Sequence, residues 1–215
     1  MNKNIQISIS GNVGVGKSTL TTNLKSTFTK AKLYEESMDD QLLDLFYKSL
    51  VDNKGISKIE LANQIAFFNG TIVRTYLGYF YEKDYHILDR PFTDHVEAFA
   101  YLNLNEEEYL QFKEYAKSTK KLLSIEPNGL IILLQASNEV VIKRIKERGR
   151  EYENDSENYK YFKALNEIYN SQRFMDELAK ECEKLVVIKT DDNSSEDTLQ
   201  QVLNEISQYE KEFVK

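Results

Sequence analysis

The sequence predicts an α/β protein in which a parallel sheet is flanked by helices. Short apolar segments at residues 5–10, 33–35, 86–89, 130–134 and 185–188 have the composition of strands. Helical patterns fill the long stretches between them, and parallel strands need such connections of about a dozen or more residues. A glycine-rich turn after the first segment leads into a helix that we expect to begin near Lys17.

The predicted elements have local reasons in the sequence. Residues 5–10 alternate apolar and polar side chains, as a strand does, and residues 130–134 are strongly apolar. Asn105 precedes three glutamates, so it offers a cap and negative charge to the start of a helix. Ser194 and Asp197 have the spacing of a capping box before another helical pattern.

Two further features are interpreted as packing rather than chemistry. The aromatic-rich stretches at residues 76–85 and 159–169 are expected to be helical core, not platforms for stacking bases. Cys182 lies between Leu178 and Leu185 at helical spacing, which favours a buried structural thiol over a nucleophile.

Length and composition exclude several classes of protein. The 215 residues contain only two prolines and eight glycines and no linker, so we expect one domain over residues 1–215. No apolar run approaches the ~18 residues of a membrane span, and no leader is recognised, which predicts a cytoplasmic protein. The net charge of −7 opposes binding to polymeric nucleic acid and to anionic membranes, but not to small phosphorylated ligands. One cysteine excludes a disulfide framework.

The strongest motif is a phosphate-binding loop between the first strand and the first helix. Its nine residues follow the pattern of glycine, four residues, then Gly-Lys-Ser: Gly11, Asn12, Val13, Gly14, Val15, Gly16, Lys17, Ser18 and Thr19. The glycines allow backbone N–H groups to turn toward phosphates, Lys17 adds a charge, and Ser18 can ligate Mg²⁺. The alternative is a glycine-rich turn without a ligand, which the motif and its context disfavour. Residues 53–56 lack the acid of a guanine-specific motif, which disfavours a regulatory GTPase.

Charged residues also follow the second and third predicted strands. Glu35 and Glu36 come after the second strand, and Asp89 with Arg90 ends the third. The carboxyl ends of parallel strands border the ligand cleft, so a glutamate there could accept a hydroxyl proton. Asp89 could order Mg²⁺, and Arg90 could hold a phosphoryl oxygen. The alternatives are an exposed acidic turn and a simple ion pair.

An arginine-rich segment follows the fourth predicted strand. Arg144 and Arg148 share one helical face, Gly149 can end the helix, and Arg150 comes next. This could be an ordinary basic helix face. In a protein with a phosphate-binding loop we interpret it as a lid over a triphosphate.

Taken together, these residues resemble the deoxynucleoside kinase family, which includes bacterial deoxyadenosine and deoxyguanosine kinases and animal deoxycytidine kinase. The resemblance rests on residues 11–19, 34–41, 45–47, 64, 89–90, 133–137 and 144–153. It implies a P-loop kinase fold with a five-stranded parallel sheet and an arginine-rich lid, often in a homodimer. It also implies that Mg²⁺ and ATP, or another nucleoside triphosphate, phosphorylate the 5′-hydroxyl of a deoxynucleoside in nucleotide salvage.

The resemblance further implies roles for single residues. Glu36, chosen over Glu35 by the register of residues 37–41, is implied as the general base, and Arg90 orients it and stabilises transferred charge. Tyr47 and Glu153 are implied to bind the sugar 3′-hydroxyl, Gln64 to bind the base edge and Phe99 to stack on the base. Asp89 and Ser18 are implied to hold magnesium, and the lid is implied to consist of Arg144, Arg148 and Arg150.

This chain departs from the family pattern at a few positions. Thr71 stands where many members carry an arginine, His95 where many carry an aspartate, and Pro91 where serine is usual. Arg74 and Asp94 lie nearby, and residues 52–60 form a longer segment than in close relatives. Overall likeness to bacterial members predicts a purine substrate.

Two rival functions belong to other classes. A nucleoside monophosphate kinase would bind a dianionic acceptor, which Glu35, Glu36, Asp39 and Asp40 would repel. A regulatory module would bind ATP without transferring phosphate. Turnover of ATP that depends on an added deoxynucleoside separates these functions.

Overall fold

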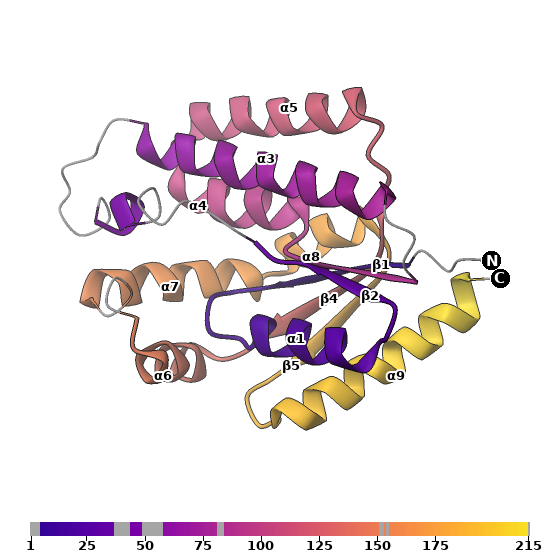
Figure 1. Ribbon diagram of the computed structural model, residues 1–215. Coiled ribbons are helices and arrows are strands. Elements are labelled where there is room, and N and C mark those ends of the chain that lie inside the picture. The colour runs from indigo at the N-terminus through magenta and orange to yellow at the C-terminus, as the bar shows by residue number, and fades with distance from the viewer. Residues whose placement is uncertain are drawn as a thin grey trace.

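The computed structural model describes residues 5–36, 44–48, 58–80, 84–150, 153 and 155–214 (Figure 1). In chain order its elements are β1 (Ile5–Gly11), α1 (Lys17–Thr27), β2 (Ala31–Tyr34), α3 (Ile59–Phe80), β3 (Tyr85–Asp89), the π-helix η1 (Asp94–Ala100), α4 (Tyr101–Asn103), α5 (Glu106–Leu122), β4 (Asn128–Gln135), α6 (Asn138–Arg148), α7 (Ser156–Tyr169), α8 (Gln172–Ala179), β5 (Cys182–Lys189) and α9 (Ser195–Phe213). A short helical segment also covers residues 44–48.

The strands form one parallel five-stranded sheet in the order β2-β3-β1-β4-β5, which confirms the predicted fold class. Each predicted strand segment coincides with an observed strand, except that β2 ends at Tyr34, one residue before the predicted end. Leu33 and Tyr34 pair with Ile87 and Leu88 of β3, and Glu35 lies beyond this pairing and is exposed. The chain therefore leaves the sheet just before Glu36.

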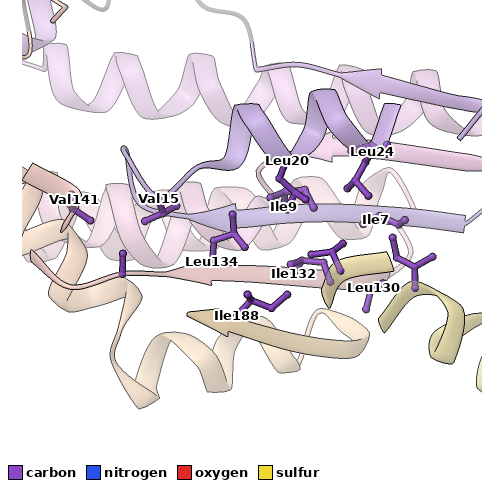
Figure 2. Close-up of a cluster of buried hydrophobic side chains, with 14 of the residues drawn as sticks. Ile7, Ile9, Val15, Leu20, Leu24, Leu130, Ile132, Leu134, Val141 and Ile188 are labelled. Atoms are coloured by element: carbon purple, nitrogen blue, oxygen red, sulfur yellow. The ribbon is translucent and has the colours of Figure 1, made fainter. Parts of the chain in front are cut away.

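Helices cover both faces of the sheet, with α3 and α5 on one side and α1 and α9 on the other (Figure 1). Strand β4 serves both layers because its side chains alternate in direction. Leu130, Ile132 and Leu134 belong to the core cluster that contains Leu20 and Leu24 of α1, as Figure 2 shows. Ile131 and Leu133 pack instead with residues of η1, α7 and α8.

The three helix caps that the sequence predicts are formed. The side chain of Asn105 accepts a hydrogen bond from the backbone N–H of Glu108, and the capping box of Ser194 and Asp197 is formed at the start of α9. Gly149 ends α6 in a left-handed conformation with a φ of 69°. None of the helices in these ranges is long and apolar enough to cross a membrane.

The helical placement of Cys182 was wrong. Helix α8 ends at Ala179, and Cys182 is the first residue of β5, where it pairs with Asn128. Its half-buried thiol donates a hydrogen bond to the Leu178 carbonyl over 3.3 Å, and burial raises its pKa to about 11. The helix ends in a turn whose backbone groups form their own hydrogen bonds. The spacing of apolar residues does not reveal such a turn.

Candidate active site

The phosphate-binding loop occupies the turn from β1 into α1 and has the backbone path that its glycines allow. Gly14 and Gly16 have φ values of 83° and 101°, which only glycine adopts without strain. Gly11 has a φ of 140°, and a Cβ added there would lie 2.6 Å from the Leu134 carbonyl oxygen. The loop thus lies directly against β4.

Two side chains of the loop hold its conformation. Asn12 donates from Nδ2 to the Phe162 carbonyl in α7 over 2.9 Å, and its Oδ1 accepts from the Val13 N–H over 2.7 Å. Lys17 Nζ donates to the Asn12 carbonyl over 2.8 Å. Burial, together with the nearby charge of Arg90, lowers the pKa of Lys17 to about 7. The negative charges near the lysine therefore do not offset the effects of burial and of Arg90 on its pKa.

Arg90 connects the ends of three strands. Its Nε donates to Glu36 Oε2 over 2.9 Å, and its Nη1 lies 3.0 Å from the Gly11 carbonyl oxygen. Nη1 also lies 3.2 Å from Asp94 Oδ2 and 2.9 Å from the Tyr169 hydroxyl. The backbone of Arg90 is left-handed, with a φ of 69°, which is strained for a residue other than glycine. Strain at a buried, multiply bonded arginine is typical of a functional site.

Asp94 is the buried anion of this group. It is fully buried and accepts hydrogen bonds from the Ser10 hydroxyl over 2.6 Å and the Tyr169 hydroxyl over 2.9 Å. Burial raises the pKa of Asp94 to about 6, although Arg90 and the two hydroxyls lower it. Asp94 thus gains or loses its charge at about pH 6. That change alters the charge that faces Arg90.

Asp89 has the surroundings of a metal ligand. Its Oδ1 is buried and has no hydrogen-bond partner in the part of the chain that the structure describes, and burial raises its pKa. Asp89 and the Ser18 hydroxyl border the same cavity as Lys17. Mg²⁺ in nucleotide enzymes takes one or two protein oxygens plus phosphate and water, so these two residues fit it.

A cavity of about 830 Å³ lies over the carboxyl ends of the strands. Nearly all of the site residues predicted from the sequence line it: Val13 to Thr19 of the loop, Glu36, Tyr47, Gln64, Asp89, Arg90, Phe99, Arg144, Arg148, Arg150 and Glu153. Gly11 and Asn12 do not line it, because Gly11 packs against β4 and the Asn12 side chain against α7. A cavity of this size is within the range of volumes that hold small-molecule ligands and cofactors.

Helix α3 supplies an uncharged wall to the cavity. Asn63, Gln64 and Phe67 of this helix line the cavity, as does Phe99 of η1, whose ring centroid lies 4.7 Å from the Arg90 guanidinium. The His95 imidazole lies behind this wall, stacked on Phe67 at a centroid distance of 5.7 Å and on Phe99 at 6.3 Å. The wall therefore combines aromatic rings with carboxamides, a combination suited to a planar polar ligand.

The arginine-rich segment is joined to the cavity by ion pairs. Arg148 Nη2 lies 2.5 Å from Glu153 Oε2, and Arg150 Nη1 lies 3.5 Å from Glu153 Oε1. Glu153 is 2% exposed, whereas the Arg150 side chain is about half exposed. Arg144 makes a separate contact, since its guanidinium donates to the hydroxyl and carbonyl of Thr190 over 2.9 Å and 2.6 Å.

Several residues of the site were not identified from the sequence. Tyr169 was expected to be core, and its ring is buried, but its hydroxyl bonds Arg90 and Asp94. Asn63 gave no signal apart from its place beside Gln64. Ser194, expected only to cap a helix, also borders the cavity.

Some predicted features lie outside the described residues. They are the register of residues 37–41, the carboxylates of Asp39 and Asp40, and most of the segment 52–60.

The fold and the loop define a nucleotide-binding protein of the phosphate-loop class, whose cavity extends to Glu36 and Asp89 at the ends of β2 and β3. A family model described as deoxynucleoside kinase matches residues 7–215, so the chain belongs to the deoxynucleoside kinase family and is a kinase. No curated protein sequence matches the chain.

Solved structures support the same fold. Deoxyadenosine kinase from M. mycoides with bound dATP is similar with a TM-score of 0.74 and 20% identity, over 94% of this chain and 100% of that chain. The same enzyme with the products dCMP and dCDP gives a TM-score of 0.70 and 19% identity, over 95% of this chain and 100% of that chain.

Proposed function

We propose that the protein transfers the γ-phosphoryl group of ATP, or of another nucleoside triphosphate, to the 5′-hydroxyl of a purine deoxynucleoside in nucleotide salvage. The position of Arg90 carries the proposal. Its guanidinium bonds Glu36 and the Gly11 carbonyl, and so joins a carboxylate to the phosphate-binding loop. Phosphoryl transfer needs both substrates in line and close together, and this arrangement supports that requirement.

Glu36 is proposed as the general base. Oε2 accepts the hydrogen bond from Arg90, while Oε1 is buried without a hydrogen-bond partner among the described residues. The 5′-oxygen bonds to the γ-phosphorus, the bond from that phosphorus to the β–γ bridging oxygen breaks, and the hydroxyl proton passes to Glu36. The products are a deoxynucleoside 5′-monophosphate and ADP.

The donor side of the proposal uses the loop and two metal ligands. The N–H groups of the loop and Lys17 hold the β- and γ-phosphates, and phosphate charge returns the lysine to its protonated form. When bound, Mg²⁺ neutralises charge that develops on the phosphates, and Ser18 and Asp89 are the residues proposed to hold it.

The arginine-rich segment is proposed to close over the donor as a lid. Glu153 is also the residue proposed to bind the sugar 3′-hydroxyl together with Tyr47, which lies 8% exposed beside the cavity. Arg148 and Arg150 are paired with this glutamate, so acceptor binding at Glu153 frees or reorients both arginines toward the phosphates.

The rival kinase is disfavoured by the charge of the acceptor subsite. A nucleoside monophosphate would place its dianionic phosphate near Glu36. Arg90 is already paired with Glu36, so its charge is not left over to balance that phosphate. The deciding experiment offers deoxyadenosine, deoxyguanosine, deoxycytidine, thymidine and the matching monophosphates with ATP and Mg²⁺. Formation of 5′-monophosphates from purine deoxynucleosides is expected. Turnover of monophosphates alone would identify the rival kinase, equal or better turnover of pyrimidines would contradict the base preference, and ATP binding without turnover would identify a regulatory module.

We propose a cytoplasmic homodimer with small molecules as its ligands. Its support is the family resemblance and the outer face of α3 and α5, where Val73, Leu77 and Leu110 are exposed. Sedimentation velocity is expected to give twice the chain mass, and Val73→Lys with Leu77→Glu is expected to give monomers. A wild-type chain that sediments as a monomer would contradict the dimer.

A further inference from the structure

The two carboxylate oxygens of Glu36 have different surroundings. Oε2 accepts from Arg90 Nε over 2.9 Å, whereas Oε1 is buried and has no hydrogen-bond partner among the described residues. Buried polar atoms in folded proteins are nearly always paired, and an unpaired buried acceptor is unfavourable. A further donor beside Oε1 would therefore hold the proposed general base from a second side.

The His95 imidazole faces this oxygen. Its Nε2 lies 3.7 Å from Glu36 Oε1, which is longer than a hydrogen bond. Hydrogen bonds around catalytic groups are often long in the free enzyme and shorten when the substrate is bound. A shift of about 0.8 Å would bring the two atoms to the usual distance of an N–H···O bond.

Two aromatic rings restrict the plane of this imidazole. The ring of His95 is stacked on Phe67 of α3 at a centroid distance of 5.7 Å and an interplanar angle of 14°, and on Phe99 at 6.3 Å and 25°. Stacked rings contact the faces of the imidazole, so Nε2 at its edge stays open to polar partners. The stacking therefore limits the directions in which Nε2 can point.

Thr71 determines which nitrogen of His95 carries the proton. The Thr71 hydroxyl oxygen lies 2.6 Å from Arg74 Nη2, 2.9 Å from His95 Nε2 and 3.2 Å from the Phe67 carbonyl oxygen. A hydroxyl has one proton, which the carbonyl can accept, and two lone pairs, which can accept from the other two groups. All three contacts are satisfied only when Nε2 is protonated, so Nε2 is an N–H donor.

This donor carries no charge. Burial, together with the charges of Arg90 and Arg74, holds the pKa of His95 well below its ordinary value. A neutral donor directs a carboxylate without placing a second positive charge beside Arg90. Such a contact orients Glu36 and leaves it able to take a proton.

We propose that His95 is a positioning residue for the general base, and that its Nε2–H donates to Glu36 Oε1 when the deoxynucleoside is bound. This role rests on the proposed function and extends it to a residue that does not line the cavity. The π-helix η1 then acts on both oxygens, because Asp94, one residue earlier, bonds the arginine that holds Oε2. Such π-helical turns are frequent at functional sites. His95 is a position where this chain departs from the family pattern, so the resemblance does not imply this contact.

The first test compares two amides at position 95. In His95→Gln the amide nitrogen reaches about as far as Nε2, whereas in His95→Asn it ends nearer the backbone, where Nδ1 lies. His95→Asn is expected to lower kcat about ten-fold, as the loss of one hydrogen bond to a charged group does, with little change in KM for the deoxynucleoside. His95→Gln is expected to recover most of kcat. Equal losses in the two variants, or a loss confined to KM, would overturn the positioning role.

The second test asks whether His95 acts through Glu36. Glu36→Gln alone is expected to lower kcat about 100-fold. Adding His95→Asn to this variant is expected to lower kcat no further, because the carboxylate that His95 orients is already absent. A further loss of about ten-fold in the double variant would show independent action and overturn the proposal.

His86→Asn is the matched control. His86 is a buried imidazole of β3 that lies 3.3 Å from the Tyr34 hydroxyl and does not line the cavity. Its kcat should be unchanged, and a loss equal to that of His95→Asn would overturn a specific role for His95. If the variants at position 95 misfold, Thr71→Val removes the hydroxyl that holds Nε2 and keeps the shape of the side chain. It should then lower kcat where Thr71→Ser does not, and an unchanged kcat would overturn the proposal.

Failure of the proposed function gives a different result. A wild-type chain that transfers no phosphate to any deoxynucleoside, or whose kcat is unaffected by Glu36→Gln, would refute the proposed function and the positioning role together. A chain in which Glu36→Gln is slow but His95→Asn is as fast as the wild type would refute the positioning role alone.

Discussion

The Tyr169 hydroxyl donates to Asp94 Oδ2 over 2.9 Å and accepts from Arg90 Nη1 at the same distance. One phenol therefore lies between a cation and an anion that are themselves 3.2 Å apart. Because Arg90 also bonds Glu36 and lines the cavity, this hydroxyl helps to fix the arginine that is proposed to orient the general base.

Removal of the hydroxyl in Tyr169→Phe is expected to lower kcat about ten-fold, because Arg90 keeps its ion pairs but loses a fixed direction. The ring stays in the core, so the melting temperature should change little. Steady-state kinetics with saturating substrates measure the effect. The control is Tyr109→Phe, which removes a hydroxyl that bonds Glu97 away from the cavity, and its kcat should be unchanged. Equal losses in the two variants would refute a positioning role.

The charge of Asp94 predicts a pH effect on activity. With a pKa of about 6, Asp94 is neutral below that pH and no longer balances Arg90. The kcat/KM of the wild-type protein should therefore rise between pH 5 and pH 7. Asp94→Asn should be slow throughout and should lack this rise, and an unchanged profile in the variant would assign the rise to another group.

The same group predicts the opposite trend in stability. Its folded pKa of about 6 lies above the ordinary value of 3.8, so the folded state binds more protons between these values. The stabilising contribution of Asp94 is complete below the ordinary value and falls as pH rises through about 6. Urea unfolding from pH 4 to pH 7 should reveal this loss in the wild-type protein and a flatter dependence in Asp94→Asn.

Lys17 is expected to take up a proton when a triphosphate binds. Its pKa of about 7 in the free protein leaves it mainly neutral at pH 8, and phosphate charge would restore the ammonium form. Calorimetry of ATP binding in buffers with different ionisation enthalpies should report nearly one proton at pH 8 and little at pH 6. Lys17→Ala should remove the uptake and most of the phosphoryl transfer, and a fast Lys17→Ala variant would refute the donor assignment.

Glu36→Gln tests the general base. This change keeps the size of the side chain but removes the group that takes the proton, so kcat should fall about 100-fold. Glu35→Gln is the matched control, because Glu35 is exposed and lies one residue away. Comparable losses, or a larger loss for Glu35→Gln, would assign the base elsewhere.

Arg148→Ala and Arg150→Ala test the lid. Both should lower kcat more than they weaken nucleoside binding, because their charge is proposed to meet the phosphates after closure. Lys143→Ala removes an exposed cation on α6, the helix of Arg148, that does not line the cavity, so this variant should be neutral. Neutral kinetics in all three variants would make this segment an ordinary basic surface.

Gly11→Ala should destabilise the protein by about 2 kcal/mol or more, because its backbone is strained for alanine and the Cβ would meet the Leu134 carbonyl. Gly149→Ala is the control, since that glycine also has a positive φ but no atom within 4 Å of an added Cβ. Its cost should be about 1 kcal/mol. Urea unfolding of both variants measures the difference, and equal costs would contradict a close approach of the loop to β4.

The sequence predicted those parts of the site whose residues are adjacent along the chain. The phosphate-binding loop has its determinants within residues 11–19, and strand 130–134 is apolar enough to predict without contacts. The family resemblance also pointed to isolated residues such as Gln64, which lines the cavity.

Contacts between distant residues could not be predicted in this way. Tyr169 and Asp94 are 75 positions apart, and a tyrosine in an aromatic helix has the same pattern whether or not its hydroxyl is used. Likewise, nothing in the sequence indicates that Asn63 lines a cavity. Cys182 was misplaced because apolar spacing does not locate a helix end.

The left-handed backbone of Arg90 affects how this protein can evolve. Glycine would relieve the conformation but would remove the guanidinium, so adaptation to heat cannot relax this residue without loss of the proposed chemistry. Substitutions that compensate for this strain must therefore arise elsewhere, for example in the hydrophobic core cluster that contains Leu20 and Ile132. Homologues from hot environments should keep an arginine here and differ in that core.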